Sequence, residues 1–196
     1  VYYYSNTLRD NITGIDVVTY NLVDGKVVET KMPNKYVFRD DYTENYKKLS
    51  FSAQEVRLGS VIEIRYEVNS NIYWEIDDIY LQKTIPVNLS ECVVRVPEMF
   101  EFNKKQLGFN PVKYEYAAES GSLSLGAGST YTYTVNADKY SASDLPAFKR
   151  EPYVYNTDQY YTAIHYDIKT LTIPGSVYEN FSVNWTDVDN SYLDSD

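Results

Sequence analysis

The sequence is poor in the residues from which catalytic and metal sites are most often built. It holds one cysteine, Cys92, and one histidine, His165, among 196 residues. A single cysteine excludes a disulfide within the chain. One cysteine and one histidine are also too few to form a tetrahedral zinc site by themselves. We therefore expect no metal site and no cofactor.

Two further absences bear on the partners of the protein. There is no run of five or more basic side chains, and the formal net charge is −10. A nucleic-acid backbone would be repelled by such a surface, so we expect no nucleic-acid partner. No apolar stretch approaches the roughly 18 residues needed to span a bilayer, so we expect no membrane span.

The start of the chain lacks the features of a signal peptide. Val1 is followed at once by tyrosines, with no basic segment and no apolar core. We therefore expect the chain to be an excised or processed piece of a longer protein.

What the sequence does contain is alternation of apolar and polar residues. In the stretch Leu58–Val68, the side chains of Ile62, Ile64, Tyr66 and Val68 fall on one side of an extended chain. The charged side chains between them fall on the other. This pattern predicts a strand with one buried face and one solvent-exposed face.

The same period of two recurs along most of the chain. Asp24-Gly25 lies between two apolar-rich runs and predicts a tight hairpin turn, whereas Asn34–Asn45 predicts irregular structure. We also expect a hairpin across Glu119–Gly121. The sequence thus predicts an all-β protein, an antiparallel β-sandwich of about a dozen strands over residues 1–180. The predicted strands are Val1–Ser5, Ile12–Val23, Lys26–Met32, Lys48–Ala53, Leu58–Asn71, Ile79–Ile85, Leu89–Val96, Phe100–Phe102, Val112–Tyr116, Ser122–Leu125, Thr130–Asn136 and Tyr161–Leu171.

The end of the chain changes character. Asn184 is a suitable N-cap for a helix that begins at Trp185. We expect residues 181–196 to form a short helical connector into a further domain.

Cys92 and His165 are the one thiol–imidazole pair that the sequence offers. Cys92 shares a strand face with Val94 and Val96, so we expect it to be buried and unreactive. His165 lies on the opposite side of its strand from Ile164, and we expect it to face solvent. A cysteine nucleophile needs its base within hydrogen-bond reach, so this pattern predicts no catalytic residue and no enzyme activity of this chain.

A cluster of carboxylates lies beside one of the two tryptophans. Glu75, Asp77 and Asp78 follow Trp74 closely. Such a cluster is most often a solvated turn, although a pair of carboxylates also forms the catalytic residues of glycosidases. These four residues are the surface that we predict to bind a ligand, if the protein has one.

Short motifs occur in a fixed order along most of the chain. They are Thr19-Tyr20-Asn21-Leu22 with Gly25-Lys26-Val27-Val28, Glu44-Asn45-Tyr46, Phe51 through Val56, Gly59-Ser60-Val61-Ile62-Glu63, Gln82 with Ile85-Pro86-Val87, Val96-Pro97-Glu98-Met99-Phe100, Leu145-Pro146-Ala147-Phe148 with Glu151-Pro152-Tyr153, and Trp185 with Val188.

By these motifs the chain resembles a domain of unknown function that precedes transglutaminase-like domains in Bacteroidetes envelope proteins. The resemblance implies an N-terminal β-sandwich whose parent protein continues into a domain with a Cys-His-Asp triad. It also implies export to the periplasm or the cell surface. Cys92 matches no catalytic position of that family.

Three hypotheses about function follow. The first is a non-catalytic accessory domain that packs against a transglutaminase-like domain in the same chain. The second is a binding module for glycan or protein, which a contiguous exposed stripe of Tyr and Trp would favour. The third is an enzyme, which a cleft with convergent carboxylates would favour.

Overall fold

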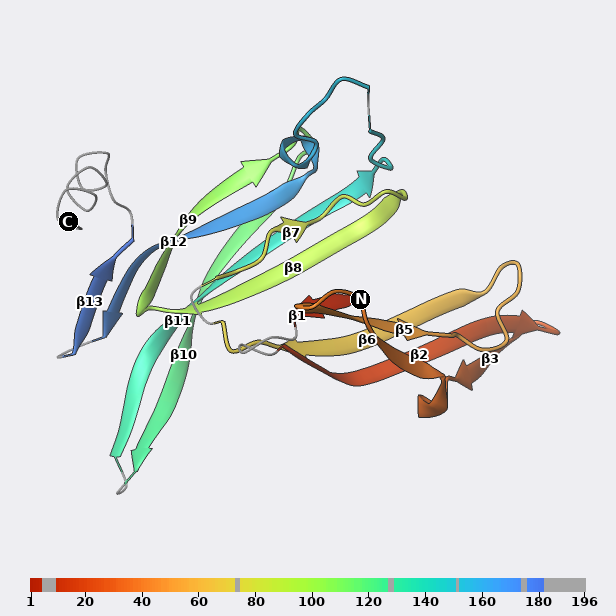
Figure 1. The fold of residues 1–196 in the computed structure, drawn as a ribbon, viewed down its shortest axis with the longest axis horizontal. Coiled ribbons are helices and arrows are strands. Elements are labelled where there is room, and N and C mark those ends of the chain that lie inside the picture. Colours follow the sequence, from red (N-terminus) through yellow and green to blue (C-terminus); the bar gives the residue numbers. More distant parts are fainter. Residues whose placement is uncertain (5–9, 73–74, 127–128, 151, 174–175, 182–196) are drawn as a thin grey trace. The chain divides into compact units, whose positions relative to one another are not determined.

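The computed structural model describes residues 1–4, 10–72, 75–126, 129–150, 152–173 and 176–181. These residues form the strands β1 to β13 and two short 3-10 helices, and none of them lies in an α-helix (Figure 1). All strand pairs are antiparallel, so the predicted all-β class is confirmed. Within these ranges, no helix is long and apolar enough to cross a membrane. The predicted helical connector lies almost wholly outside the described residues.

Contacts divide the chain into two compact units, Val1–Tyr73 and Trp74–Asp196. The sequence predicts one domain over residues 1–180, and its patterns contain no sign of this division. The first unit holds two three-stranded sheets, with strand orders β1-β5-β4 and β3-β2-β6. Its elements are β1 (Tyr2–Tyr4), β2 (Asn11–Val23), β3 (Lys26–Lys31), the 3-10 helix η1 (Asn34–Tyr36), β4 (Val37–Asp41), β5 (Tyr46–Phe51) and β6 (Val61–Asn69).

One turn and one longer segment of the first unit test the sequence patterns. Asp24 and Gly25 join β2 to β3 with φ values of 49° and 75°, as the predicted hairpin requires. The prediction of irregular structure over Asn34–Asn45 is wrong for β4. That strand is exposed over most of its length and pairs with β5 at the edge of its sheet, so it needs no apolar alternation.

Strand β6 differs from its prediction in burial. Ile62 and Ile64 keep 41% and 47% of their surface exposed, although alternation predicts that this face is buried. Their direct neighbours on β2, Thr19 and Val17, are 1% exposed. β2 is the central strand of its sheet and pairs on both sides, whereas β6 lies at the edge. Period-2 alternation identifies the apolar side of a strand but not what covers it.

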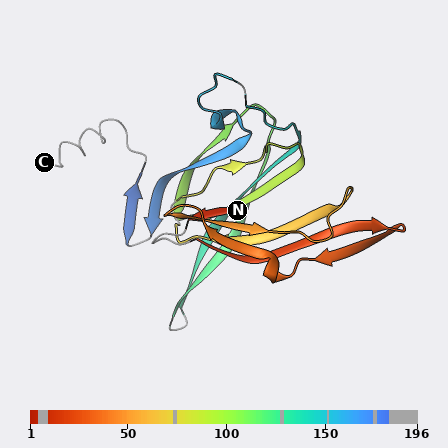
Figure 2. The same ribbon diagram turned by 45° about the vertical axis from the view of Figure 1, so that its right-hand side comes forward.

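The second unit contains two antiparallel sheets. One has the order β10-β11-β8, and the other places β9 on one side of β12 and both β7 and β13 on its other side (Figure 2). The elements are β7 (Ile79–Tyr80), β8 (Val87–Pro97), β9 (Phe100–Leu107), β10 (Lys113–Gly126), β11 (Ser129–Leu145), the 3-10 helix η2 (Asp158–Tyr160), β12 (Ala163–Ile173) and β13 (Val177–Asn180).

The predicted turn at Glu119–Gly121 is wrong, because β10 runs through it without a break. Gly121 lies opposite Tyr133 of β11, and the Tyr133 ring occupies the space that a Cβ atom at position 121 would need. Glycine here allows close approach of a neighbouring ring, which is its other common role in a strand.

The core of the second unit lies between its two sheets. Tyr140 of β11 and Ile164 and Tyr166 of β12 are buried in it, and Cys92 and Val94 of β8 pack against it. The predicted inward faces of β8 and β12 are therefore confirmed. This arrangement places His165, which lies between Ile164 and Tyr166 in sequence, on the outer face of its sheet.

Candidate functional site

Cys92 and His165 belong to opposite sheets and opposite environments. Cys92 pairs with Tyr140 on the inner side of its sheet. The sequence predicts that Cys92 is buried, whereas the structure shows it half-buried. Burial raises the pKa of its thiol above the ordinary value. His165 is exposed on the outer side of β12, as predicted. The thiol and the imidazole therefore do not form a pair.

The partner of His165 is Asp78. The His165 Nδ1 atom lies 2.6 Å from Asp78 Oδ1, and 30% of the Asp78 side-chain surface is exposed. This contact joins the segment before β7 to the first part of β12, across a separation of 87 residues. It makes Asp78 a positioned side chain rather than a freely solvated one.

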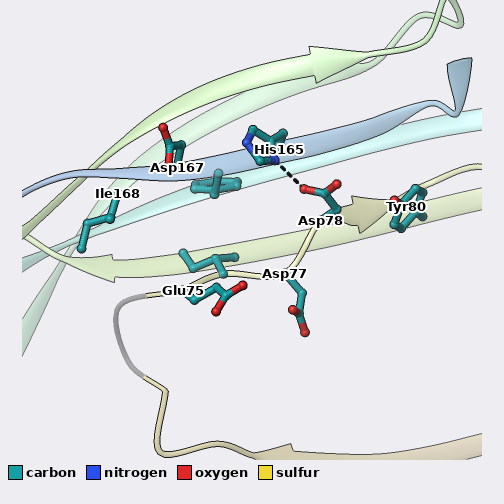
Figure 3. Close-up of a pocket in the computed structure, with 9 residues that line it drawn as sticks. Glu75, Asp77, Asp78, Tyr80, His165, Asp167 and Ile168 are labelled. Atoms are coloured by element: carbon teal, nitrogen blue, oxygen red, sulfur yellow. Dashed lines mark hydrogen bonds and ion pairs between the residues drawn. The ribbon is translucent and has the colours of Figure 1, made fainter. Parts of the chain in front are cut away.

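Around this contact is a groove of about 670 Å³, here called the edge groove (Figure 3). Figure 3 shows Asp78 reaching toward His165, while Asp77 points away from β12. The lining residues come from two short segments of the second unit: Glu75, Ile76, Asp77, Asp78 and Tyr80, and His165, Tyr166, Asp167 and Ile168.

The groove exists because β12 lacks a paired strand along part of one edge. On the side away from β9, β7 pairs with Ala163 and Ile164, and β13 pairs with Thr170 to Ile173. Residues 165–168 between them pair only with β9, as far as the structure describes the chain. Residues 75–78 run beside this stretch without forming a ladder with it.

Three of the four residues predicted as a binding surface line the edge groove. They are Glu75, Asp77 and Asp78, whereas Trp74 lies outside the described residues. Sequence reasoning missed Tyr80, His165 and Asp167, because strand pairing brings them to the groove from distant positions and no local pattern signals it.

The chemistry of the edge groove is that of an acidic, open surface. Its carboxylates lie on different sides of β12 and do not converge on one point (Figure 3). In the described part of the chain, no three His, Cys, Asp or Glu side chains are placed to hold a metal ion. The arrangement offers hydrogen-bond acceptors and negative charge to a ligand that lies along the strand edge.

A second cavity, of about 440 Å³, lies at another place in the same unit. Phe109, which is 84% exposed, and Tyr160 contribute rings whose centroids are 6.1 Å apart. Exposed aromatic rings supply a large apolar contact area to a ligand or a partner. The lining residues are Gln82, Phe109, Asn110, Phe148, Lys149, Val154, Thr157 and Tyr160.

The chain shares its fold with a bacterial protein of known structure. The match is to the crystal structure of a "putative protease" from Parabacteroides distasonis, with a TM-score of 0.57 and 17% sequence identity. It covers 85% of this chain but 31% of the other. At this identity the likeness concerns the fold alone.

Comparison of sequences adds nothing to this match. No protein-family model matches the chain, and no curated protein matches it.

Proposed function

We propose that this chain is an accessory, non-catalytic β-sheet region of an exported Bacteroidetes protein, located in the periplasm or at the cell surface. In this proposal it packs against, and supports, a transglutaminase-like domain that follows it in the same chain. The family resemblance of its motifs supports this role, and the structural match to part of a longer Bacteroidetes protein is compatible with it.

The observation that carries the proposal is the exposure of β6. Val61, Ile62, Ile64, Tyr66 and Val68 each keep between 41% and 65% of their surface exposed. Ile62, Ile64, Tyr66 and Val68 share one face of the strand. A contiguous exposed apolar face commonly marks a surface that contacts another protein. In this proposal the transglutaminase-like domain is what covers β6.

The test compares this chain with its parent protein. In the parent, we expect slower amide exchange on β6 and a higher melting temperature, because a partner that binds only the folded state stabilises it. Ile64→Asp should lower the melting temperature more in the parent than in the isolated chain. Leu22→Asp, which changes a side chain that is 70% exposed on the neighbouring strand, should lower both equally. Unchanged exchange on β6 would contradict the proposal.

A separate assay addresses catalysis. The isolated chain should show no thiol-dependent peptide hydrolysis, because His165 is paired with Asp78 on the outer face while Cys92 packs against the core. Hydrolysis that Cys92→Ala abolishes would contradict a non-catalytic role.

The second candidate function is a binding module for protein or glycan. The edge groove and the cavity beside Phe109 and Tyr160 favour it. For a glycan, the test is retardation of the chain in polysaccharide gels, with Phe109→Ala expected to reduce it. Retardation that Phe109→Ala leaves unchanged would exclude the aromatic cavity as the glycan site.

A further inference from the structure

We propose that the edge groove binds an extended basic peptide, which adds a short strand to β12. The proposal deepens the second candidate function, since it names the ligand class and the register of a protein-binding site. It concerns the second unit alone and is independent of what covers β6.

The direction of the backbone groups on β12 supports strand addition at this edge. Thr162 O accepts hydrogen bonds from Leu81 N and Gln82 N, and Ile164 pairs with Ile79 of β7. Backbone groups alternate in direction along an antiparallel strand. The N–H and C=O groups of Tyr166 and Ile168 therefore point to the same side as those of Thr162 and Ile164, where the described residues supply them with no ladder partner.

The chain's own neighbouring segment, residues 75–78, leaves this edge of β12 open. Ile76 packs against the core, and Asp78 is held by His165, so residues 75–78 are anchored at two points. The edge groove lies between residues 75–78 and β12. A sheet edge with a groove beside it is the structural requirement for strand addition by an extended peptide.

The charge of the edge groove favours a basic peptide. Glu75, Asp77, Asp78 and Asp167 line the edge groove, and no lysine or arginine does. Lys169, the nearest lysine in sequence, is hydrogen-bonded to Glu101 of β9 at 2.5 Å. The edge groove is therefore acidic, with Asp78 alone of these carboxylates facing the imidazole, and electrostatic complementarity selects lysine or arginine side chains.

The same charge disfavours the chain's own C-terminal residues as the occupant. Residues 182–196 contain Asp187, Asp189, Asp194 and Asp196 and no lysine or arginine. Carboxylates brought into an acidic groove would be repelled.

The faces of β12 define the sequence that fits. Tyr166 and Ile168 point inward and Asp167 points outward, so a paired strand presents its alternate residues in the same way. The residue opposite Asp167 should be basic, and those opposite Tyr166 and Ile168 should be apolar. Alternating valine and lysine satisfies this pattern.

The probe is a capped, fluorescently labelled peptide of about seven residues with alternating valine and lysine, long enough to pass the open stretch of β12. We expect the full chain to bind it, and to bind a glutamate-for-lysine version at least about tenfold more weakly. Asp167→Lys should weaken binding by a similar factor. Glu98→Lys is the matched control, because Glu98 is an exposed carboxylate outside the groove, and it should leave the affinity unchanged.

A second measurement separates strand addition from simple charge attraction. N-methylation of the peptide at alternate residues removes N–H donors from one side of its backbone only. Methylation on the side that faces β12 should abolish binding, while methylation on the other side should be tolerated, and Tyr166 and Ile168 should gain amide-exchange protection. Equal loss from both methylation patterns, equal affinity for the lysine and glutamate peptides, or no binding of the lysine peptide would overturn the proposal.

Discussion

The phenol oxygens of Tyr140 and Tyr166 lie 2.9 Å apart between the two sheets of the second unit, and Tyr166 also donates a hydrogen bond to Asp138 at 3.2 Å. Asp138 has no exposed surface, accepts a hydrogen bond from Tyr114 at 2.6 Å and pairs with Lys104. A buried polar group is costly unless its partners are present. This network of five side chains therefore ties β9, β10, β11 and β12 together in one arrangement.

The network predicts that its two central tyrosines are not equivalent. Tyr166→Phe removes one of the donors to Asp138 and leaves the Tyr140 hydroxyl without its partner. This change should lower the free energy of unfolding by about 2–3 kcal/mol. Tyr140→Phe leaves the bond from Tyr166 to Asp138 intact and should cost about 1 kcal/mol. Tyr153→Phe, at a fully exposed ring, is the control and should change stability by less than about 0.5 kcal/mol. Urea unfolding measures all three, and equal costs at Tyr140 and Tyr166 would refute the network.

Protonation of Asp138 should make the free energy of unfolding depend on pH. Burial by itself would raise the pKa of Asp138, but hydrogen bonds from Lys104, Tyr114 and Tyr166 outweigh it and lower the pKa below the ordinary value. A carboxyl with a lowered folded pKa stabilises the protein above its unfolded pKa of about 3.9, and this stability is lost as pH falls through the folded pKa.

Asp138→Asn should therefore be less stable than the wild type by about 2 kcal/mol at neutral pH, and the gap should narrow below about pH 4. Amide exchange on β11 and β12 at a series of pH values provides the measurement. A gap that stays constant down to pH 3 would show that the charge of Asp138 has no part in it.

Tyr114 should ionise at a higher pH than a tyrosine whose hydroxyl donates to no carboxylate. Its hydrogen bond to Asp138, together with burial and the charge of that carboxylate, raises the pKa of Tyr114 to about 12. In alkaline titration followed by phenolate absorbance, Tyr114→Phe should remove a component that ionises near this pH and leave the earlier components unchanged. Loss of an early component instead would mean that the Tyr114 hydroxyl is free in solution.

Gly108 is predicted to resist substitution for two reasons. Its φ is 71°, a value that a residue with a side chain rarely adopts. A Cβ atom at this position would lie 2.6 Å from the carbonyl oxygen of Tyr161, so the backbone at Tyr161 would have to move. Gly108→Ala should cost more than about 2 kcal/mol. Gly59→Ala has the same kind of φ, 88°, but open space around it, so only the conformational strain of about 1 kcal/mol is expected. Similar losses at the two sites would show that the contact with Tyr161 is relieved cheaply.

The sequence is most informative where strand faces and turns are encoded locally. The inward faces of β8 and β12 and the turn at Asp24-Gly25 follow from neighbours in sequence, and the structure confirms them. Glu119–Gly121 misleads because glycine fits both a turn and a ring contact, and only the partner strand decides between them.

The edge groove could be predicted only in part. The carboxylates of Glu75, Asp77 and Asp78 are visible as a cluster, but the cluster predicts a solvated turn as readily as a site. His165 and Asp167 join them because β7 and β13 leave one edge of β12 without a paired strand at residues 165–168, whose other edge pairs with β9. Strand pairing over such distances depends on tertiary packing, which a periodic pattern does not report.

Cys92 supplies the last prediction, which concerns the reactivity of the thiol in the native protein. The thiolate is the reactive form, and burial raises the pKa of Cys92, so less thiolate is present at any given pH than for a free cysteine. The side chain also packs against the core, which limits access of a reagent. Native Cys92 should therefore react with an alkylating reagent at least about tenfold more slowly than an exposed cysteine.

The matched control moves the thiol by one residue to the opposite face of β8. Val93 is 42% exposed, so Val93→Cys in a Cys92→Ala background places a thiol outward on the same strand. In urea both thiols should react at the same rate, because the difference arises only from folding. If the two thiols react at equal rates in the native proteins, Cys92 does not pack against the core. It would then not be separated from His165 by the sheet in which it lies.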